Sequence, residues 1–195
     1  MQRPESYRAL HHVSGPVRCI ETDVGEIDFL PVLMDALARE APGITLRCLP
    51  VADTALREQM AAGRVELALG SLPQLQGGFF QQALFRQRYV ALMRAGHPLA
   101  GSTALSATRY RQAAHVRVVS AGTAHGQVDD ALQRLGVVRR VQLTVPHYVA
   151  LGQVLASTDL VATVPERLAE RLAGPHGLAS RPLGLKLPTS TIAQL

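Results

Sequence analysis

Short apolar segments alternate with amphipathic segments over the first third of the chain. The apolar segments are typical of strands that are buried on both faces, as in parallel sheets. The amphipathic segments carry apolar residues at the three- and four-residue spacing of a helix. This pattern predicts a βαβαβ unit, with strands at 17–21, 44–49 and 65–69 and helices at 27–37 and around Leu56–Met60.

The same plan returns in the second half of the chain. Strands are expected at 115–119, 141–145 and 160–164, with helices at 128–135 and 149–155. Two β-type runs joined by a polar turn, at 79–85 and 89–94, lie between the two units. Two similar α/β lobes are therefore favoured, and a single continuous sheet is the alternative.

Two segments have the form of a capping box, in which an N-cap residue is followed three positions later by Glu. The first is Asp23-Val24-Gly25-Glu26, which makes Asp23 the expected N-cap. The second is Thr163-Val164-Pro165-Glu166, with a proline in the expected first turn.

The composition is that of an ordinary globular protein, with 47% hydrophobic and 18% charged residues. No run approaches the ~18 consecutive apolar residues that span a bilayer. The polar segment Met1–Gly15 does not resemble a signal peptide, so we expect a cytoplasmic protein without a membrane partner. The formal charge of +5 comes from scattered arginines rather than from a basic run. It indicates a mildly basic solvated surface and not a nucleic-acid site.

Motifs that would indicate an enzyme are missing from the sequence. It contains no glycine-rich dinucleotide loop, P-loop, nucleophile elbow, His-Glu-x-x-His or Cys-x-x-Cys. We therefore predict no catalytic residue, no cofactor and no metal. Cys19 and Cys48 lack metal-ligand spacing, fall in predicted strands, and are expected to be reduced and inert, with a disulfide as the alternative.

Loops at the carboxyl ends of the predicted strands carry hydroxyls and small residues. In open parallel sheets such loops hold the ligand, and helix N-termini favour anions. A small, acidic and partly apolar ligand is therefore expected, although any single hydroxyl is more often a helix cap than a ligand contact. His125 and His147 are expected just inside two helices of the second lobe, and either can instead have a structural role. The candidates are Thr22, Ser71, Ser120, His125, His147 and Thr163.

Several motifs resemble those of the effector-binding domain of LysR-type transcriptional regulators. They are Phe29-Leu30-Pro31, Arg64–Gly70 and Gly96–Ala100, and the resemblance covers about 17–195. Gly122–Gly126, Val145–Tyr148 and Thr158–Pro165 are similar to the branch of that family that senses salicylate, nitroaromatic breakdown products or flavonoid-like inducers.

The resemblance implies an α/β fold of two Rossmann-like lobes, of the type 2 periplasmic-binding-protein kind, joined by crossover strands. Lobe I would be 17–94 plus 183–195, lobe II would be 95–182, and 1–16 would be a remnant or linker. A small aromatic or acidic effector would bind between the lobes, and two copies would pair through the helix containing Ile27–Leu37. In this family DNA is bound through a helix-turn-helix domain that precedes lobe I. Only 16 residues precede lobe I in this sequence, so we expect a fragment or a truncated gene product.

The resemblance also bears on single residues. Thr22 matches the family's ligand-contacting Ser or Thr after the first strand, and His125 and His147 match histidines of the aromatic-sensing branch. Ser71, Ser120 and Thr163 are candidates by position only. The leading interpretation is an inducer-sensing module; a free-standing binding protein and an enzyme on the same fold are the alternatives.

Overall fold

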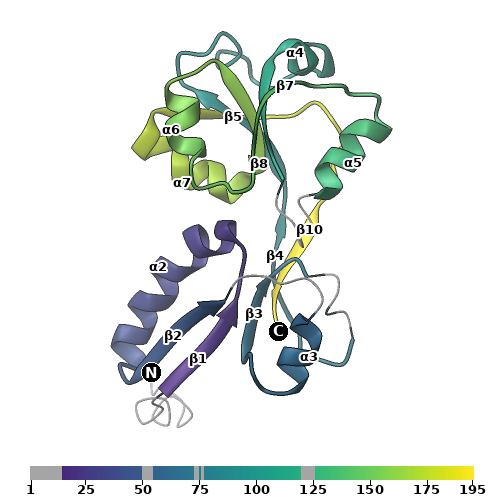
Figure 1. Ribbon diagram of the computed structural model, residues 1–195. Coiled ribbons are helices and arrows are strands. Elements are labelled where there is room, and N and C mark those ends of the chain that lie inside the picture. Colours follow the sequence, from purple (N-terminus) through teal and green to yellow (C-terminus); the bar gives the residue numbers. More distant parts are fainter. Residues whose placement is uncertain (1–14, 50–54, 73–74, 76, 120–125) are drawn as a thin grey trace, which may run out of the picture. The chain divides into compact units, whose positions relative to one another are not determined.

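A computed structural model describes residues 15–49, 55–72, 75, 77–119 and 126–195. The chain forms two compact units (Figure 1). The first extends to Gln82 and includes Ala193–Leu195, and the second is Ala83–Ile192. The described residues form two separate five-stranded sheets, so the two-lobed α/β prediction is confirmed and the single continuous sheet is wrong.

The sheet of the first unit has the order β2-β1-β3-β10-β4. Strands β1 (Gly15–Ile20), β2 (Ile44–Leu49) and β3 (Leu67–Gly70) are parallel, and β10 (Ser190–Gln194) pairs antiparallel with β3. Strand β4 (Gln82–Gln87) pairs with β10, and the chain passes between the units along these two strands.

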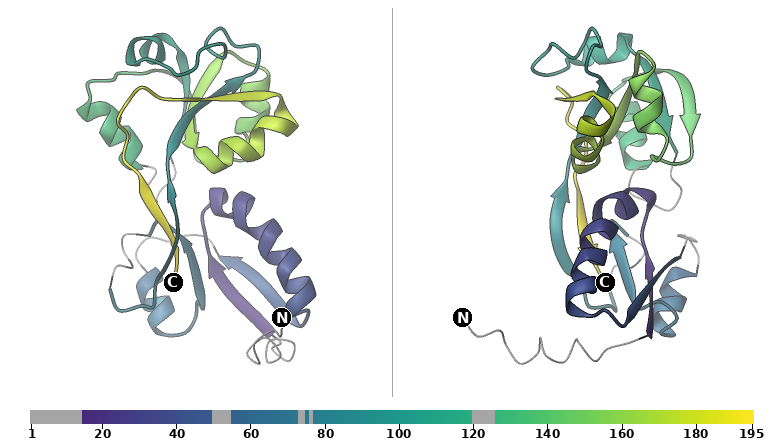
Figure 2. Two further views of the ribbon diagram at one scale, coloured as in Figure 1. Left: turned by 180° about the vertical axis from the view of Figure 1, so that it is seen from behind. Right: turned by 90° about the vertical axis from the view of Figure 1, so that its left-hand side faces the viewer.

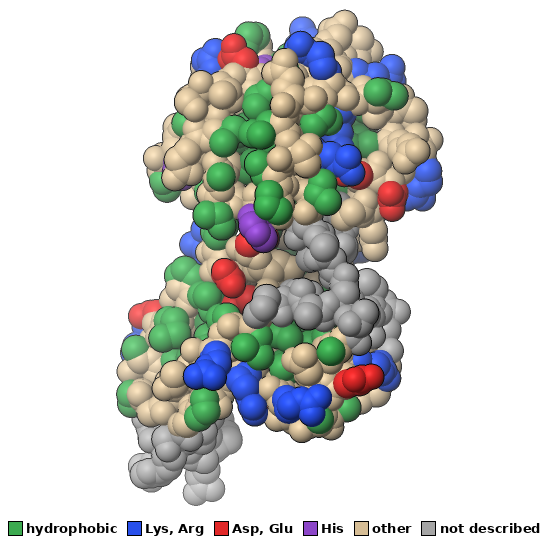
Figure 3. Space-filling view, viewed as in Figure 1, with side chains coloured by type: hydrophobic (Ala, Val, Ile, Leu, Met, Phe, Trp, Pro, Cys, Tyr) green, Lys and Arg blue, Asp and Glu red, His purple; other side chains and the backbone are tan. Residues whose placement is uncertain are grey.

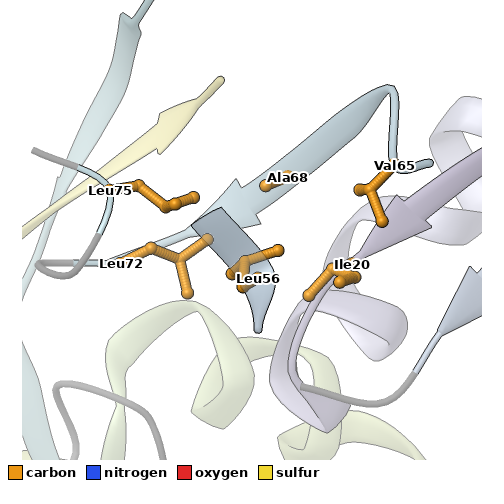
Figure 4. Packing of buried hydrophobic residues seen from close by; sticks show 6 residues of the cluster. All are labelled: Ile20, Leu56, Val65, Ala68, Leu72 and Leu75. Atoms are coloured by element: carbon orange, nitrogen blue, oxygen red, sulfur yellow. The ribbon is translucent and has the colours of Figure 1, made fainter. Parts of the chain in front are cut away.

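Two helices join the parallel strands of the first unit, α2 (Asp23–Glu40) and α3 (Leu56–Ala61). They lie on opposite faces of the sheet (Figure 1). Beneath α3, apolar side chains form a core that excludes water almost completely (Figure 4). Its members are Ile20, Leu56, Val65, Ala68, Leu72 and Leu75.

The sheet of the second unit has the order β7-β6-β8-β5-β9. Strands β6 (Ala114–Val118), β7 (Arg140–Val145) and β8 (Leu160–Pro165) are parallel, whereas β5 (Tyr89–Arg94) runs antiparallel to β8 and β9 (Leu178–Pro182). Helices α6 (Leu151–Ala156) and α7 (Glu166–His176) cover one face, and α5 (Gly126–Arg134) covers the other (Figure 2). Helix α4 (Ala107–Gln112) contributes Tyr110 to the core beside α5.

Both predicted capping boxes are wrong in detail. Helix α2 is capped by Thr22, and Asp23 is its first residue. Helix α7 begins at Glu166 with Pro165 as N-cap and no side-chain cap. Thr163 pairs in register with Ala91 of β5, and this pairing holds it in the extended strand β8.

The segment between the two predicted βαβαβ units also differs from expectation. Only Arg88 separates β4 from β5, and the two strands belong to different sheets instead of forming a hairpin. Strand β5, which the predicted boundaries assign to lobe I, therefore pairs within the second sheet. None of the helices among the described residues is both long enough and apolar enough to cross a membrane.

Candidate functional site

Two candidate residues of the first unit leave its sheet at the same edge. Strands β1 and β3 are adjacent and parallel, with Ile20 in register with Ala68. Thr22 follows β1 and Ser71 follows β3 directly, after Gly70, whose φ of 142° lets the chain turn. The fold thus brings Thr22 and Ser71 to the carboxyl ends of neighbouring strands, where α/β proteins hold their ligands.

Thr22 has a structural task as well as a place at this edge. Its hydroxyl oxygen accepts a hydrogen bond from the Gly25 amide at 3.3 Å, and its carbonyl accepts one from the Glu26 amide at 2.8 Å. The hydroxyl keeps its own O–H, which can donate to a ligand. Asp23 and Glu26 in the first turn already place negative charge at the helix N-terminus, which reduces its attraction for an anion.

His147 does not lie where the sequence analysis placed it. It lies in the loop that follows β7 and is exposed, four residues before α6 begins at Leu151. The next residue, Tyr148, is buried, and its carbonyl accepts the Leu151 amide at 3.0 Å. The buried tyrosine therefore anchors the loop and leaves the histidine ring in solvent, at the carboxyl end of β7.

The hydroxyl of Thr163 is already engaged inside the second unit. It lies 2.6 Å from the hydroxyl of Tyr110, a fully buried side chain whose pKa is raised by burial. Nearby, Asp129 accepts from Arg117 at 2.6 Å and also pairs with Arg139. No sequence signal points to the contact of Thr163 with Tyr110, because the two residues are 53 positions apart in the chain.

Ser120 and His125, the remaining candidates, lie outside the described residues.

A third group of side chains meets in the first unit, between β1 and β2. Cys19 and Cys48 are register partners in these parallel strands, and their Sγ atoms are 3.2 Å apart. The Cys48 thiol donates to Glu21 Oε1 at 3.6 Å. Sequence spacing alone carried no such signal, since the residues meet only through the register of two strands.

Burial dominates the acid–base behaviour of this group. It raises the pKa of Cys19 to about 12 and that of Cys48 above its ordinary value. It also raises the pKa of Glu21 to about 7, because little water reaches the carboxylate. Both thiols are therefore protonated at neutral pH.

A neutral histidine is held in the core of the second unit. His115 is fully buried, and its Nε2 lies 2.7 Å from the Tyr110 carbonyl, which requires an N–H on that nitrogen. Burial lowers the pKa of its imidazole below the ordinary value. This histidine supports the fold and does not lie at the carboxyl ends of the strands, where the candidate residues are found.

The family model and the most similar relatives that we compared point to the same protein family. Residues 19–194 match the LysR substrate binding domain. The chain is 49% identical over 171 residues to the HTH-type transcriptional activator NagR of a Ralstonia species, covering 88% of this chain and 56% of NagR. It is 44% identical over 171 residues to the HTH-type transcriptional activator NahR of Pseudomonas putida, covering 88% and 57%. The chain thus spans little more than half the length of these relatives.

A solved structure shows the same fold. The crystal structure of probable transcriptional regulator PA0477 from Pseudomonas aeruginosa superimposes with a TM-score of 0.82 at 28% identity. The match covers 95% of this chain and 63% of that one.

Proposed function

Because the chain belongs to the LysR substrate-binding domain family, we propose that it senses a small aromatic carboxylate on behalf of a transcriptional regulator. The observation that carries this proposal is the 49% identity to NagR, which extends over 88% of the chain and so includes both units. NagR and NahR are named transcriptional activators, which favours sensing over catalysis.

The chemistry of the strand ends supports a carboxylate ligand. Thr22 and His147 each offer a polar hydrogen to a carboxylate oxygen, and Ser71 offers a second hydroxyl. A hydrogen bond to a charged group contributes roughly 1.5–3 kcal/mol. We propose Thr22, Ser71 and His147 as effector contacts. Ser120, His125 and Thr163 are proposed as further contacts by resemblance.

The remaining partners are also proposed from the family. DNA contact is assigned to the part of such a regulator outside the matched 171 residues, and the regulator would act in the cytoplasm. A second copy of this chain is proposed to pair through α2, which leaves Val32 61% and Met34 48% exposed. Figure 3 shows apolar side chains over the part of the first unit where α2 lies.

A thermal-shift panel tests the proposed ligand class. Benzoate and 2-hydroxybenzoate are compared with benzyl alcohol, which lacks the charge, and with cyclohexanecarboxylate, which lacks the flat ring. A ligand at 100 times its Kd adds about 2.7 kcal/mol of stability. At roughly 2–4 °C per kcal/mol for a chain of this size, the Tm should rise by about 5–11 °C. Equal shifts with all four compounds, or no shift with any, would refute an aromatic carboxylate.

A further inference from the structure

We propose that Cys19, Glu21 and Cys48 form a binding site for a thiophilic divalent cation of the zinc class. The group shares no residue with the proposed effector contacts and lies near the carboxyl ends of β1 and β2. One ligand atom from each of the three residues lies within 4.8 Å of the other two.

Two of the three distances in this group are close to those of a tetrahedral zinc site. With Zn–S bonds of about 2.3 Å and a Zn–O bond of about 2.1 Å, tetrahedral angles place sulfur about 3.6 Å from oxygen and the two sulfurs about 3.8 Å apart. The Cys48 Sγ–Glu21 Oε1 distance is already 3.6 Å. The two Sγ atoms, at 3.2 Å, need to separate by only a few tenths of an ångström, which side-chain rotation allows.

Glu21 supplies an independent indication that this group binds a cation. Its side chain is 3% exposed, and within the described part of the chain its Oε2 has no hydrogen-bond partner. A buried carboxylate oxygen without a partner is costly. A cation bound to the carboxylate offsets that cost, because it neutralises the charge that the two oxygens share. Rotation of the carboxylate can present either oxygen to the ion.

The local packing keeps the Glu21 carboxylate next to the thiols. A Cβ added at Gly25 would lie 3.0 Å from Glu21 Oε2, so the absence of a side chain at position 25 makes room for the carboxylate beneath the first turn of α2. Cys19 is fully buried and Cys48 only partly, so an ion and its water reach the site from the side of Cys48.

Metal binding at this group balances without an oxidant. Two thiols and a cation give two metal–sulfur bonds and release two protons to solvent, together with the Glu21 proton where that carboxyl is protonated, and no electrons are transferred. The resulting −3 of ligand charge meets +2 on the ion, and water fills the fourth position. Disulfide formation instead requires an oxidant that accepts two electrons.

Cobalt substitution in the complete, reduced and metal-stripped chain tests the proposal. One equivalent of Co²⁺ should give a thiolate-to-cobalt charge-transfer band and the intense visible bands of a tetrahedral ion, and Zn²⁺ should displace it. Cys19→Ser and Cys48→Ser should each abolish the charge-transfer band of the two-thiolate site. Glu21→Gln should weaken Co²⁺ binding at least tenfold, whereas Asp35→Asn, which neutralises an exposed carboxylate on α2, should leave it unchanged.

A second measurement needs no variant and covers the case in which the serine variants fail to fold. Zn²⁺ should protect both thiols of the unaltered chain from a thiol reagent, and a chelator should restore their reactivity. Absence of the charge-transfer band, unprotected thiols, or a Cys19–Cys48 disulfide that forms in place of metal binding would each overturn the proposal.

Discussion

Replacing Thr22 with Ala removes two interactions that can be measured separately. The first is the N-cap of α2, in which Thr22 Oγ1 accepts the Gly25 amide at 3.3 Å. Loss of a Thr cap costs about 1 kcal/mol, which corresponds to a fall in Tm of roughly 2–4 °C. The second is the proposed hydrogen bond to the effector carboxylate, whose loss of roughly 1.5–3 kcal/mol lowers affinity by about 10- to 100-fold.

Ser106→Ala is the matched control for this experiment. Ser106 caps α4 in the second unit, and its Oγ accepts the Arg109 amide at 3.4 Å. This variant should lose stability of the same order and bind the effector normally, while Thr22→Ser should retain both properties. Thermal unfolding and isothermal titration calorimetry with 2-hydroxybenzoate measure the two effects. If Thr22→Ala and Ser106→Ala bind equally well, Thr22 is a helix cap only and the reasoning is refuted.

Three further predictions concern other parts of the chain. His147→Ala should weaken an aromatic carboxylate by about 10- to 100-fold in calorimetry and leave the Tm of the ligand-free protein unchanged, because the side chain is exposed and caps no helix; an unchanged affinity would return the histidine to a surface role. Because burial depresses the pKa of His115 in the folded state, its contribution to stability is complete above pH 6.5 and is lost as the pH falls below that value. Urea denaturation at pH 7.5 and 5.5 should show this loss, and His115→Gln should reduce it; an identical pH dependence in the variant would exclude His115 as the cause. Val32→Arg, which places a charge on the exposed apolar side of α2, should shift any dimer towards monomer in sedimentation experiments, and an unaffected dimer would place the interface elsewhere.

The apolar segments were sufficient to predict most strands. Strand β2 matches its predicted range, and β1, β3, β6, β7 and β8 lie within about two residues of theirs. Strands β3, β5 and β8 are mostly buried and read as nearly continuous apolar runs, as strands buried on both faces do. Strands β2 and β7 are partly exposed and were recognised from their apolar residues alone. The α2 cap was misplaced because Thr22 and Asp23 are both good N-caps, and the choice between them depends on where β1 ends.

The details of the candidate sites depend on contacts that sequence spacing does not encode. Thr163 meets Tyr110 across 53 positions, and Cys19 meets Cys48 across 29. Each contact follows from strand register or helix packing, which becomes definite only when the sheet forms. His147 was placed in a helix because Val145-Pro146 suggests a helix start, whereas a turn begins at Tyr148, whose side chain is buried, and α6 begins only at Leu151.

The central claim is that this chain binds a small aromatic carboxylate, and calorimetry with 2-hydroxybenzoate tests it most directly. One molecule should bind per chain, with affinity lowered by Thr22→Ala and, independently, by His147→Ala. Unchanged affinity in only one of these variants would remove that residue from the proposed contacts. Absence of binding, or affinity unchanged in both variants, would contradict the account.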